Sequence, residues 1–351
     1  MPIKALIVDD TVTYRKILSD ILSGIPEIEV IGTAPNGVIA LKKIALQPVD
    51  IVFLDLFMPE MDGIETLKNI RKDFVKTKAV MVSSGNPSDV RSTISALELG
   101  AIDFIQKPAL SNQQANIDFL KKEITRVLNL FPFRREAKPV PSAAFQPVKP
   151  VMPVSKTLKP AHVDVFVIGV STGGPEALHK FIPFLPASLS VPVLLVQHMP
   201  PVFTSSLADS LSKKSKVKVV EAKEGDIVEK GTVYIAPGGR HMTVMSRDLR
   251  NVIALNDGPP ENSCRPSVDV LFRSVASVYS QGSILSLIMT GMGSDGLNGV
   301  RALKRKNCYS ITQSESTCVV YGMPRAVDEA GLSDLSVPLP ELAEQVSKLI
   351  H

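Results

Sequence analysis

Ser171 lies in a short segment of this chain that could hold a nucleophile. It belongs to the turn Gly169-Val-Ser-Thr-Gly173-Gly174, which follows the apolar run 165–170 and matches the pattern G-x-S-x-G. This pattern can place a serine on a sharp turn between a strand and a helix, with its hydroxyl exposed. Taken alone, the match is weak evidence, because serine and glycine are common in turns and glycine-rich turns also bind phosphate.

A serine nucleophile needs a base, and His198 is the best placed of the five histidines. It follows the apolar run 193–196 at the end of the next predicted strand, so it can lie beside Ser171. A purely structural role is the alternative. The other four lie in a proline-rich stretch, on the serine's own helix, in a glycine-rich segment and at the last position: His162, His179, His241 and His351. His179 is roughly 12 Å along its helix from Ser171, and His241 would at most border the site.

Asp295 is the matching candidate for the acid that orients the base. It follows the apolar run 283–289 in the turn "TGMGSDGLNG", whereas Asp209, Asp248 and Asp269 lie in segments that look helical or hairpin-like. Asp295 could also simply cap a helix. The order serine, histidine, aspartate differs from the serine, aspartate, histidine order of α/β-hydrolases, but the three roles would be the same.

A second group of polar residues lies in the N-terminal part of the chain. Asp9 and Asp10 end the first predicted strand, Asp55 the third and Ser83 the fourth, and Lys107 follows the fifth. Three carboxylates at one sheet edge would repel one another unless a cation such as Mg²⁺ lay among them. A metal, a hydroxyl and an ammonium around Asp55 would stabilise a phosphoryl group attached to it. The alternative is that these acids are merely hydrated.

Both groups of residues require parallel strands that end at one edge, and the sequence predicts an α/β fold in two domains. Strand and helix patterns alternate over residues 1–130, as in a doubly wound, flavodoxin-like sheet. Residues 131–160 are rich in proline and are expected to form a linker. Residues 161–351 resume the alternation as a Rossmann-like α/β domain, with a small antiparallel excursion indicated near 225–239.

Composition narrows the class of protein. The chain has 351 residues, 44% of them hydrophobic and 21% charged, and a net charge of +4 that is too small to argue for nucleic acid. It has no apolar run of about 18 residues and no signal-peptide pattern, so we expect a cytoplasmic protein with no membrane insertion. Three cysteines (Cys264, Cys308 and Cys318) have neither disulfide-framework nor metal-ligand spacing.

Two other functions are compatible with parts of this pattern. A nucleotide-binding module would explain a glycine-rich turn, but it calls for G-x-G-x-x-G and an acid at the end of the next strand, and neither is present. A DNA-binding response regulator would need a helix-turn-helix in the second half, which the sequence does not indicate.

The first 125 residues or so resemble response-regulator receiver domains, through the pieces "VDD", "FLDLFMPEMDG", "MVSS" and "QKP". The resemblance implies that Asp55 is phosphorylated and that Asp10 binds Mg²⁺ directly, Asp9 mostly through water. Phe57 would contribute its backbone carbonyl to the metal, although a large aromatic is unexpected there. Lys107 would contact the phosphoryl group.

The second domain resembles the catalytic domain of the CheB family of chemotaxis protein-glutamate methylesterases. The matching pieces are "STGGP", "QHMP", "RPSVDVLF", "TGMGSDG" and "VVYGMPRA". The resemblance implies a triad of Ser171, His198 and Asp295, with Thr172 and the Met292 backbone near the oxyanion. No cofactor is implied for the ester hydrolysis.

The same resemblance implies partners and control. A histidine kinase would be the phosphodonor, and methylated cytoplasmic helices of chemoreceptors would be the substrate, with glutamine deamidation as a second activity. Ser83 and Phe104 would form the switch pair of the receiver, and phosphorylation would relieve its obstruction of the active site. Cys264 departs from the family, which commonly has histidine before "RPSVD". An esterase acting in another signalling system remains an alternative.

Overall fold

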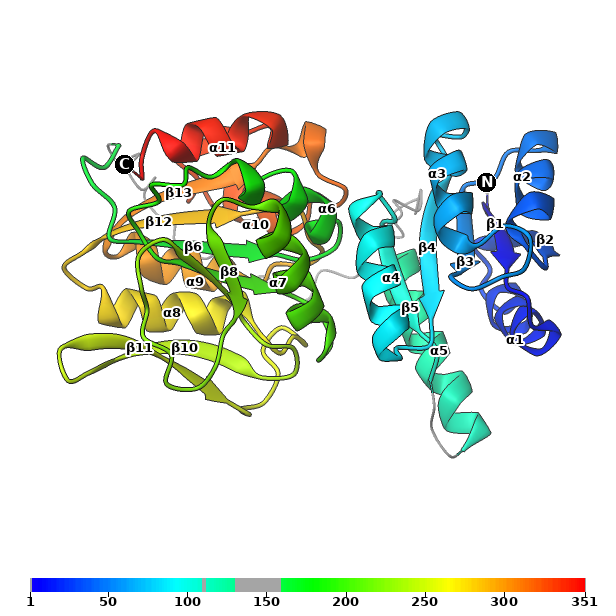
Figure 1. Ribbon diagram of the computed structural model, residues 1–351, viewed down its shortest axis with the longest axis horizontal. Coiled ribbons are helices and arrows are strands. Elements are labelled where there is room, and N and C mark those ends of the chain that lie inside the picture. Colours follow the sequence, from blue (N-terminus) through cyan, green and yellow to red (C-terminus); the bar gives the residue numbers. More distant parts are fainter. Residues whose placement is uncertain (1, 109–111, 130–158, 351) are drawn as a thin grey trace, which may run out of the picture. The chain divides into compact units, whose positions relative to one another are not determined.

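The computed structural model describes residues 2–108, 112–129 and 159–350, and they form two compact units (Figure 1). The first unit ends with a helix at Leu128 and the second begins with a strand at Val165. The predicted linker, residues 131–160, lies outside the described residues except for its last two. Its bounds therefore stay a prediction, and each unit is described by itself.

The first unit is a five-stranded parallel sheet of order β2-β1-β3-β4-β5 with helices in the connections. This is the flavodoxin-like order that the alternating pattern predicted. Its strands are β1 (Ile3–Val8), β2 (Ile28–Ala34), β3 (Ile51–Asp55), β4 (Lys78–Ser83) and β5 (Asp103–Gln106). Its helices are α1 (Val12–Ser23), α2 (Gly37–Leu46), α3 (Gly63–Asp73), α4 (Pro87–Glu98) and α5 (Gln113–Leu128).

Local sequence explains these elements. Apart from Lys4 and the terminal Asp55, the strands β1 and β3 consist of apolar residues, because helices cover both faces of a doubly wound sheet. Three of its helices begin at capping side chains. Asn36 accepts a hydrogen bond from the Ile39 N–H, Asp62 accepts one from the Glu65 N–H, and Asn112 accepts one from the Gln114 N–H. Because the strands are parallel, the loops that follow β1, β3 and β5 meet at one edge of the sheet, where Asp9, Asp55 and Lys107 lie.

The second unit is built on a seven-stranded parallel sheet of order β14-β13-β12-β6-β7-β9-β8. The strands are β6 (Val165–Val170), β7 (Val193–Gln197), β8 (Lys218–Glu221), β9 (Thr232–Ile235), β12 (Ser283–Ile288), β13 (Asn307–Gln313) and β14 (Leu335–Val337). Every residue of β6, β7 and β12 is buried, which fits their position in the middle of the sheet. From β6 the chain first adds β7 on one side of this strand, and it later returns to add β12 on the other side. The strand order thus reverses at β6, where α/β proteins commonly bind ligands.

Helices cover this sheet, and α8 and α9 lie side by side on one face (Figure 1). The helical elements are α6 (Gly174–His179), η1 (Ile182–Phe184), α7 (Phe203–Lys214), α8 (Val268–Val278), α9 (Leu297–Lys304), η2 (Glu315–Thr317), α10 (Met323–Glu329) and α11 (Leu339–Ser347). A buried cluster of apolar side chains joins α8 to the sheet and includes Val268, Phe272, Val167 and Ile288.

The antiparallel excursion is a hairpin of β10 (His241–Arg247) and β11 (Arg250–Asn256), packed against α8. It follows the segment 225–239 in which the sequence indicated it. That segment contains β9, which pairs in parallel, and joins the hairpin through one antiparallel bridge between Ile227 and Val252.

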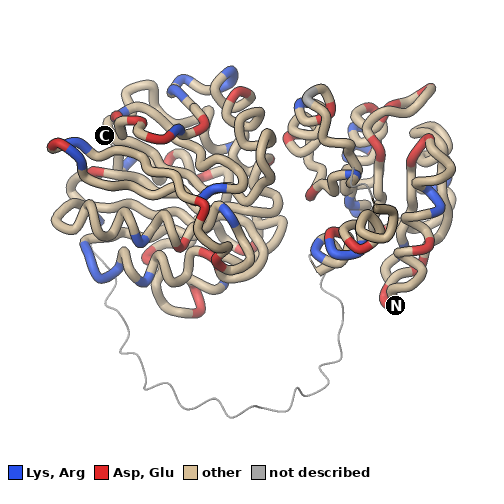
Figure 2. The backbone as a smooth tube through the Cα atoms, turned by 90° about the horizontal axis from the view of Figure 1, so that it is seen from below, with Lys and Arg blue, Asp and Glu red and all other residues tan. Residues whose placement is uncertain are grey.

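Lys and Arg, like Asp and Glu, are distributed along the chain of the second unit (Figure 2). Within the described ranges, no helix is both long enough and apolar enough to cross a membrane.

Candidate active site

Ser171, His198 and the Asp295 loop come from three neighbouring strands. Ser171 directly follows β6, His198 directly follows β7, and Asp295 lies in the loop between β12 and α9. Because β12, β6 and β7 are adjacent and parallel, their carboxyl ends share one edge of the sheet. Thus the structure brings all three residues to the edge where the sequence predicted them.

The His198–Asp295 pair is joined by a hydrogen bond of 2.8 Å between Nε2 and Oδ2. The histidine side chain is 12% exposed and the carboxylate 2%. Burial alone would raise the pKa of the Asp295 carboxyl, but hydrogen bonds from His198 and from the Val268 and Asp269 N–H groups lower it to about 2. The acid is therefore ionised and oriented before any ligand arrives.

The imidazole of His198 is shifted in the opposite direction. Burial alone would lower its pKa, but the hydrogen bond to Asp295 and the neighbouring thiol of Cys264 raise it to about 9. Since Asp295 occupies Nε2, the ring presents Nδ1 to the rest of the site. Any proton transfer by this histidine would use Nδ1.

The backbone of Ser171 is fixed from three sides. Its N–H donates to Thr290 O, and its carbonyl accepts from Gly174 N–H and from Gln197 Nε2. Gln197 Nε2 also donates to the His198 carbonyl, so one amide links the two strand ends. Across the described residues, the Ser171 hydroxyl makes no hydrogen bond to His198; such contacts often form only when substrate is bound.

The glycine-rich turn is shaped by Gly173, which has φ of 75° and precedes α6. A left-handed residue of this kind favours glycine. A Cβ on Gly173 would also meet the side chain of Val319 at 2.6 Å. These glycines thus bend the chain sharply after Ser171.

The "TGMG" loop lies against the nucleophile candidate. A Cβ on Gly291 would lie 2.8 Å from Ser171 Cβ, so the loop approaches the serine as closely as a glycine allows. Met292, the next residue, is half-buried, and Thr172 is buried with its carbonyl accepting from Thr290 Oγ1. The two residues predicted near the oxyanion thus lie close to Ser171. Thr172 directly follows Ser171, and Met292 directly follows Gly291.

Two of the histidines that the sequence set aside have structural partners. His179 Nδ1 lies 2.8 Å from the carbonyl oxygen of Pro175, one turn earlier on its helix. His241 is buried; its Nε2 lies 3.0 Å from the Pro259 carbonyl oxygen and its Nδ1 accepts from the Ser267 N–H. His241 thereby borders the site through Ser267 without entering it.

Three residues that sequence reasoning did not select bind Asp295. Asn262 Nδ2, Ser267 Oγ and the Asp269 N–H all donate to Asp295 Oδ1, at 2.9 to 3.1 Å. Asp269 is itself fully buried, although it lies on the helical stripe shared with Phe272 and Ala276. The sequence did carry a signal for this residue, namely an acid within the apolar stripe of a predicted helix. A buried carboxylate needs hydrogen-bond donors, so such an acid indicates a partner elsewhere in the fold.

In the first unit, the three acids lie together. One carboxylate oxygen from each of Asp9, Asp10 and Asp55 falls within 4.8 Å of the others. This spacing fits a cation of the size of Mg²⁺ with oxygen ligands. Lys107 Nζ lies 2.8 Å from Asp9 Oδ2 and 3.0 Å from Asp55 Oδ2. Burial raises the pKa of Asp55 to about 6, with Lys107 opposing and Asp9 reinforcing the shift.

The remaining predicted receiver residues surround this cluster. Ser83 is buried at the end of β4, and its hydroxyl accepts from Thr93 Oγ1 at 2.9 Å. Phe104 is buried on β5, and Phe57 is 53% exposed. The roles predicted for these residues stay predictions.

Comparison with known proteins identifies the family. The CheB methylesterase family model matches residues 166–346, and the response regulator receiver domain model matches residues 5–117. The chain belongs to the CheB methylesterase family. A protein-glutamate methylesterase/protein-glutamine glutaminase of Desulfotalea psychrophila is 44% identical over 355 residues, covering 98% of this chain and 97% of the relative.

Other relatives support the same placement of this CheB-family chain. A protein-glutamate methylesterase/protein-glutamine glutaminase of Methanosarcina acetivorans is 42% identical over the full length of both proteins. The crystal structure of the Thermotoga maritima CheB methylesterase catalytic domain is 38% identical, with a TM-score of 0.52, and covers 53% of this chain and 98% of that domain. The predicted fold class, a receiver followed by an α/β catalytic domain, is thereby confirmed.

Cys264, which the sequence analysis singled out as a departure from the family pattern, contacts His198. Its Sγ lies 3.5 Å from His198 Nδ1, and the cysteine is half-buried. The sequence analysis did not predict this contact. The segment that carries it includes Asn262 and Ser263, which have φ of 53° and 62°.

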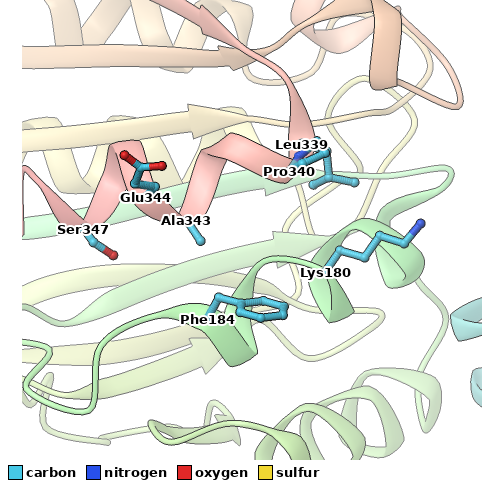
Figure 3. Close-up of a pocket in the computed structure, with 7 residues that line it drawn as sticks. All are labelled: Lys180, Phe184, Leu339, Pro340, Ala343, Glu344 and Ser347. Atoms are coloured by element: carbon cyan, nitrogen blue, oxygen red, sulfur yellow. The ribbon is translucent and has the colours of Figure 1, made fainter.

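A surface groove lies elsewhere on the catalytic unit of this CheB-family chain, between α11 and the segment 180–184 (Figure 3). Lys180 and Phe184 form one side and Leu339, Ala343 and Glu344 the other. None of the predicted catalytic residues lines this groove.

Proposed function

We propose that this chain is a phosphorylation-activated serine hydrolase that removes methyl groups from glutamate γ-methyl esters of chemotaxis receptors. We propose glutamine deamidation as its second activity, since the names of its relatives include both activities. The observation that carries the proposal is the His198–Asp295 hydrogen bond of 2.8 Å at the strand ends beside Ser171. The match of the methylesterase family model over this unit supports the same reaction.

Acylation begins at the serine. Ser171 Oγ attacks the ester carbonyl carbon, and its proton passes to Nδ1 of neutral His198. Asp295, bonded to Nε2, stabilises the imidazolium that forms. The bond to the methoxy oxygen then breaks, the proton of His198 goes to that oxygen, and methanol leaves.

Deacylation repeats the steps with water. His198 takes a proton from water, hydroxide attacks the acyl carbon, and the bond to Ser171 Oγ breaks with return of a proton to the serine. The product is a free glutamate side chain. For a glutamine substrate the first leaving group is ammonia instead of methanol, and the same acyl-enzyme forms.

Stabilisation of the oxyanion is assigned to the backbone beside Ser171. The close approach of Gly291 to Ser171 supports a role for the Met292 N–H, and Thr172 directly follows the nucleophile. Donors aimed at the developing negative charge commonly contribute about 3–4 kcal/mol to such reactions. We infer that this domain needs no metal for hydrolysis, because the triad supplies both nucleophile and base.

In the receiver unit, Asp55 is proposed as the residue that accepts the phosphoryl group from a histidine kinase. Asp10 and Asp9, with the Phe57 carbonyl, would hold Mg²⁺, which offsets the charge of the phosphoryl group when bound. Lys107, already within 3.0 Å of Asp55, would move to the phosphoryl oxygens. Ser83 and Phe104 would then report the change to the rest of the protein.

The substrate and location follow from this function. Methylated glutamates on the cytoplasmic helices of chemoreceptors are the proposed substrates, which makes the chain a cytoplasmic enzyme. Neither direct membrane insertion nor nucleic-acid binding is proposed.

The test is release of methanol from methylated chemoreceptors. We expect the full-length chain to release methanol and Ser171→Ala to release none above background. Persistent activity in Ser171→Ala would remove the nucleophile from the proposal. The matched control is Ser210→Ala, because Ser210 is a helical serine that contacts His179 on the same unit.

The regulatory part needs a separate experiment. Acetyl phosphate with Mg²⁺ should stimulate methanol release by the full-length chain, and Asp55→Ala should lose the stimulation while keeping the unstimulated rate. Equal stimulation of both proteins would contradict control through Asp55. An esterase of another signalling system is distinguished by activity on methylated proteins other than chemoreceptors.

A further inference from the structure

The contact between Cys264 and His198 has the geometry of two ligands of one metal ion. Cys264 Sγ lies 3.5 Å from His198 Nδ1, and the carboxylate of Asp295 lies with them in a group whose ligand atoms are within 4.8 Å. In a tetrahedral zinc site the Zn–S distance is about 2.3 Å and the Zn–N distance about 2.0–2.1 Å, so the sulfur and nitrogen ligands lie about 3.5 Å apart. The observed separation thus needs little adjustment to accept the ion.

The second ring nitrogen is also arranged as in zinc proteins. A histidine that binds a metal through one nitrogen usually donates the other N–H to a carboxylate, which fixes the tautomer. Asp295 Oδ2 has this role toward Nε2 at 2.8 Å. Asp295 is in turn held by Asn262 and Ser267, so the orientation of the imidazole is set in advance.

We propose that Cys264 and His198 form an inhibitory site for a thiophilic divalent cation, with Zn²⁺ as the best-fitting ion. Binding converts the Cys264 thiol to a thiolate and releases its proton to solvent, and where the imidazole is protonated the proton on Nδ1 of His198 is released as well. The ion takes the Nδ1 lone pair that would accept the proton of Ser171, so ester hydrolysis stops. The inhibition rests on the function proposed above, whereas the binding itself does not.

The site is open and therefore reversible. Cys264 is half-buried and the side chain of His198 is 12% exposed, and water would fill the remaining coordination positions. Closed structural zinc sites use four protein ligands, whereas two protein ligands hold the ion less tightly. A chelator should therefore restore activity.

The two cation sites of the chain differ in chemistry. The receiver site offers three carboxylates, which suit Mg²⁺, and it contains no sulfur. The catalytic site offers thiolate and imidazole, which select Zn²⁺ or Co²⁺ over Mg²⁺. The same protein could thus be activated with one cation and inhibited by another.

Direct binding is tested with Co²⁺, added to the reduced full-length chain. A thiolate ligand gives Co²⁺ an intense near-ultraviolet charge-transfer band, which carboxylates at the receiver site cannot give. We expect the band in the unmodified chain and in Cys318→Ala, and none in Cys264→Ala. Cys318 is the matched control because it is also a half-buried free cysteine. Absence of the band from the unmodified chain, or its presence in Cys264→Ala, would overturn the proposal.

The inhibition is tested by titrating Zn²⁺ into the methanol-release assay and then adding a chelator. The full-length protein should lose activity as Zn²⁺ is added and regain it with the chelator. Half-inhibition of Cys264→Ala should need at least roughly tenfold more Zn²⁺. Equal sensitivity of both proteins would refute inhibition at this site. If the unmodified chain hydrolyses no ester at all, the proposed function fails, and the Co²⁺ band still decides whether the metal site exists.

Discussion

Asp269 accepts hydrogen bonds from the N-terminus of α9, and Asp295 accepts hydrogen bonds from the N-terminus of α8. Asp269, on α8, accepts hydrogen bonds from the Gly296 and Gly299 N–H groups at the start of α9, at 3.0 and 2.6 Å. Asp295, just before α9, accepts from the Val268 and Asp269 N–H groups at the start of α8, at 2.7 and 3.1 Å. Free N–H groups at a helix start favour a carboxylate. Asp295, the predicted orienting acid, is therefore part of a structural joint between two helices.

The first prediction removes one half of this joint. Asp269→Ala leaves the buried Gly299 N–H without its acceptor and removes one of the two acceptors of the Gly296 N–H, so we expect the free energy of unfolding to fall by about 1–3 kcal/mol. Asp295 would also lose its support, and ester hydrolysis should fall with it. Urea unfolding of the full-length chain, followed by circular dichroism, measures the stability.

The control for this prediction is Asp209→Ala. Asp209 is an exposed residue of α7, and its removal should change the free energy of unfolding by no more than about 0.5 kcal/mol. If Asp269→Ala were as stable as Asp209→Ala, the reciprocal caps would contribute nothing.

Sequence reasoning reached the site residues that end strands. Ser171, His198 and Asp55 each lie at or directly after the end of a buried apolar run, and parallel strands bring such ends to one edge. The same rule explains why the fold of both units could be predicted. Alternating apolar runs and helical spacing carry this information locally.

The rest of the site depends on contacts that no local pattern encodes. Asn262 and Cys264 arrive on a loop whose course is set by backbone angles at Asn262 and Ser263. Asp269 lies on a helix, and its partners at the start of α9 are 27 and 30 residues away in sequence. Periodicity indicates that Asp269 is buried but not what it binds.

The second prediction concerns the pH dependence of activity. Hydrolysis requires neutral His198, whose pKa is held at about 9 against the effect of burial by Asp295 and Cys264. The value of kcat/KM should therefore rise about tenfold per pH unit toward a plateau above pH 9. Cys264→Ala removes one of the groups that raise this pKa, so its midpoint should lie closer to neutral pH. A pH profile of methanol release, with Cys318→Ala as control, checks both statements; an unchanged midpoint would contradict the second.

The third prediction concerns stability and pH. The pKa of Asp295 is lowered to about 2, so its contribution to the free energy of unfolding is present above about pH 4 and is lost as the pH falls toward 2. The pKa of His198 is raised to about 9, so its contribution is complete below about pH 6.5 and is lost as the pH rises through 9. Stability from this pair is thus greatest between about pH 4 and 6.5.

The size of this effect is about 2–3 kcal/mol, counted once because the two shifts describe one interaction. Urea unfolding at a series of pH values should show the loss between about pH 6.5 and 9 in the unmodified chain, and a smaller loss in Asp295→Asn. Parallel curves for the two proteins would show that the pair does not contribute. On the alkaline side, activity should therefore increase while stability decreases, because both changes follow the same proton.

The last prediction tests the close approach of Gly291 to the nucleophile. In Gly291→Ala the new Cβ would lie 2.8 Å from Ser171 Cβ and against Met323 Sδ. The methionine side chain can rotate away, but Ser171 is fixed by its hydrogen bond to Thr290 O at 2.9 Å. Relief must therefore displace the serine or the loop that carries Met292, and a shift of about 1 Å in such a site commonly costs about 100-fold in rate.

We expect kcat/KM for methanol release to fall about 100-fold in Gly291→Ala. The free energy of unfolding measured in urea should fall by only about 1–3 kcal/mol. Gly24→Ala is the matched control, because its Cβ would meet no atom closer than 3.4 Å and its φ is −79°. It should leave both measurements close to those of the unmodified chain. Full activity in Gly291→Ala would mean that the loop can retreat from Ser171, and the Met292 N–H could then not be a fixed donor to the oxyanion.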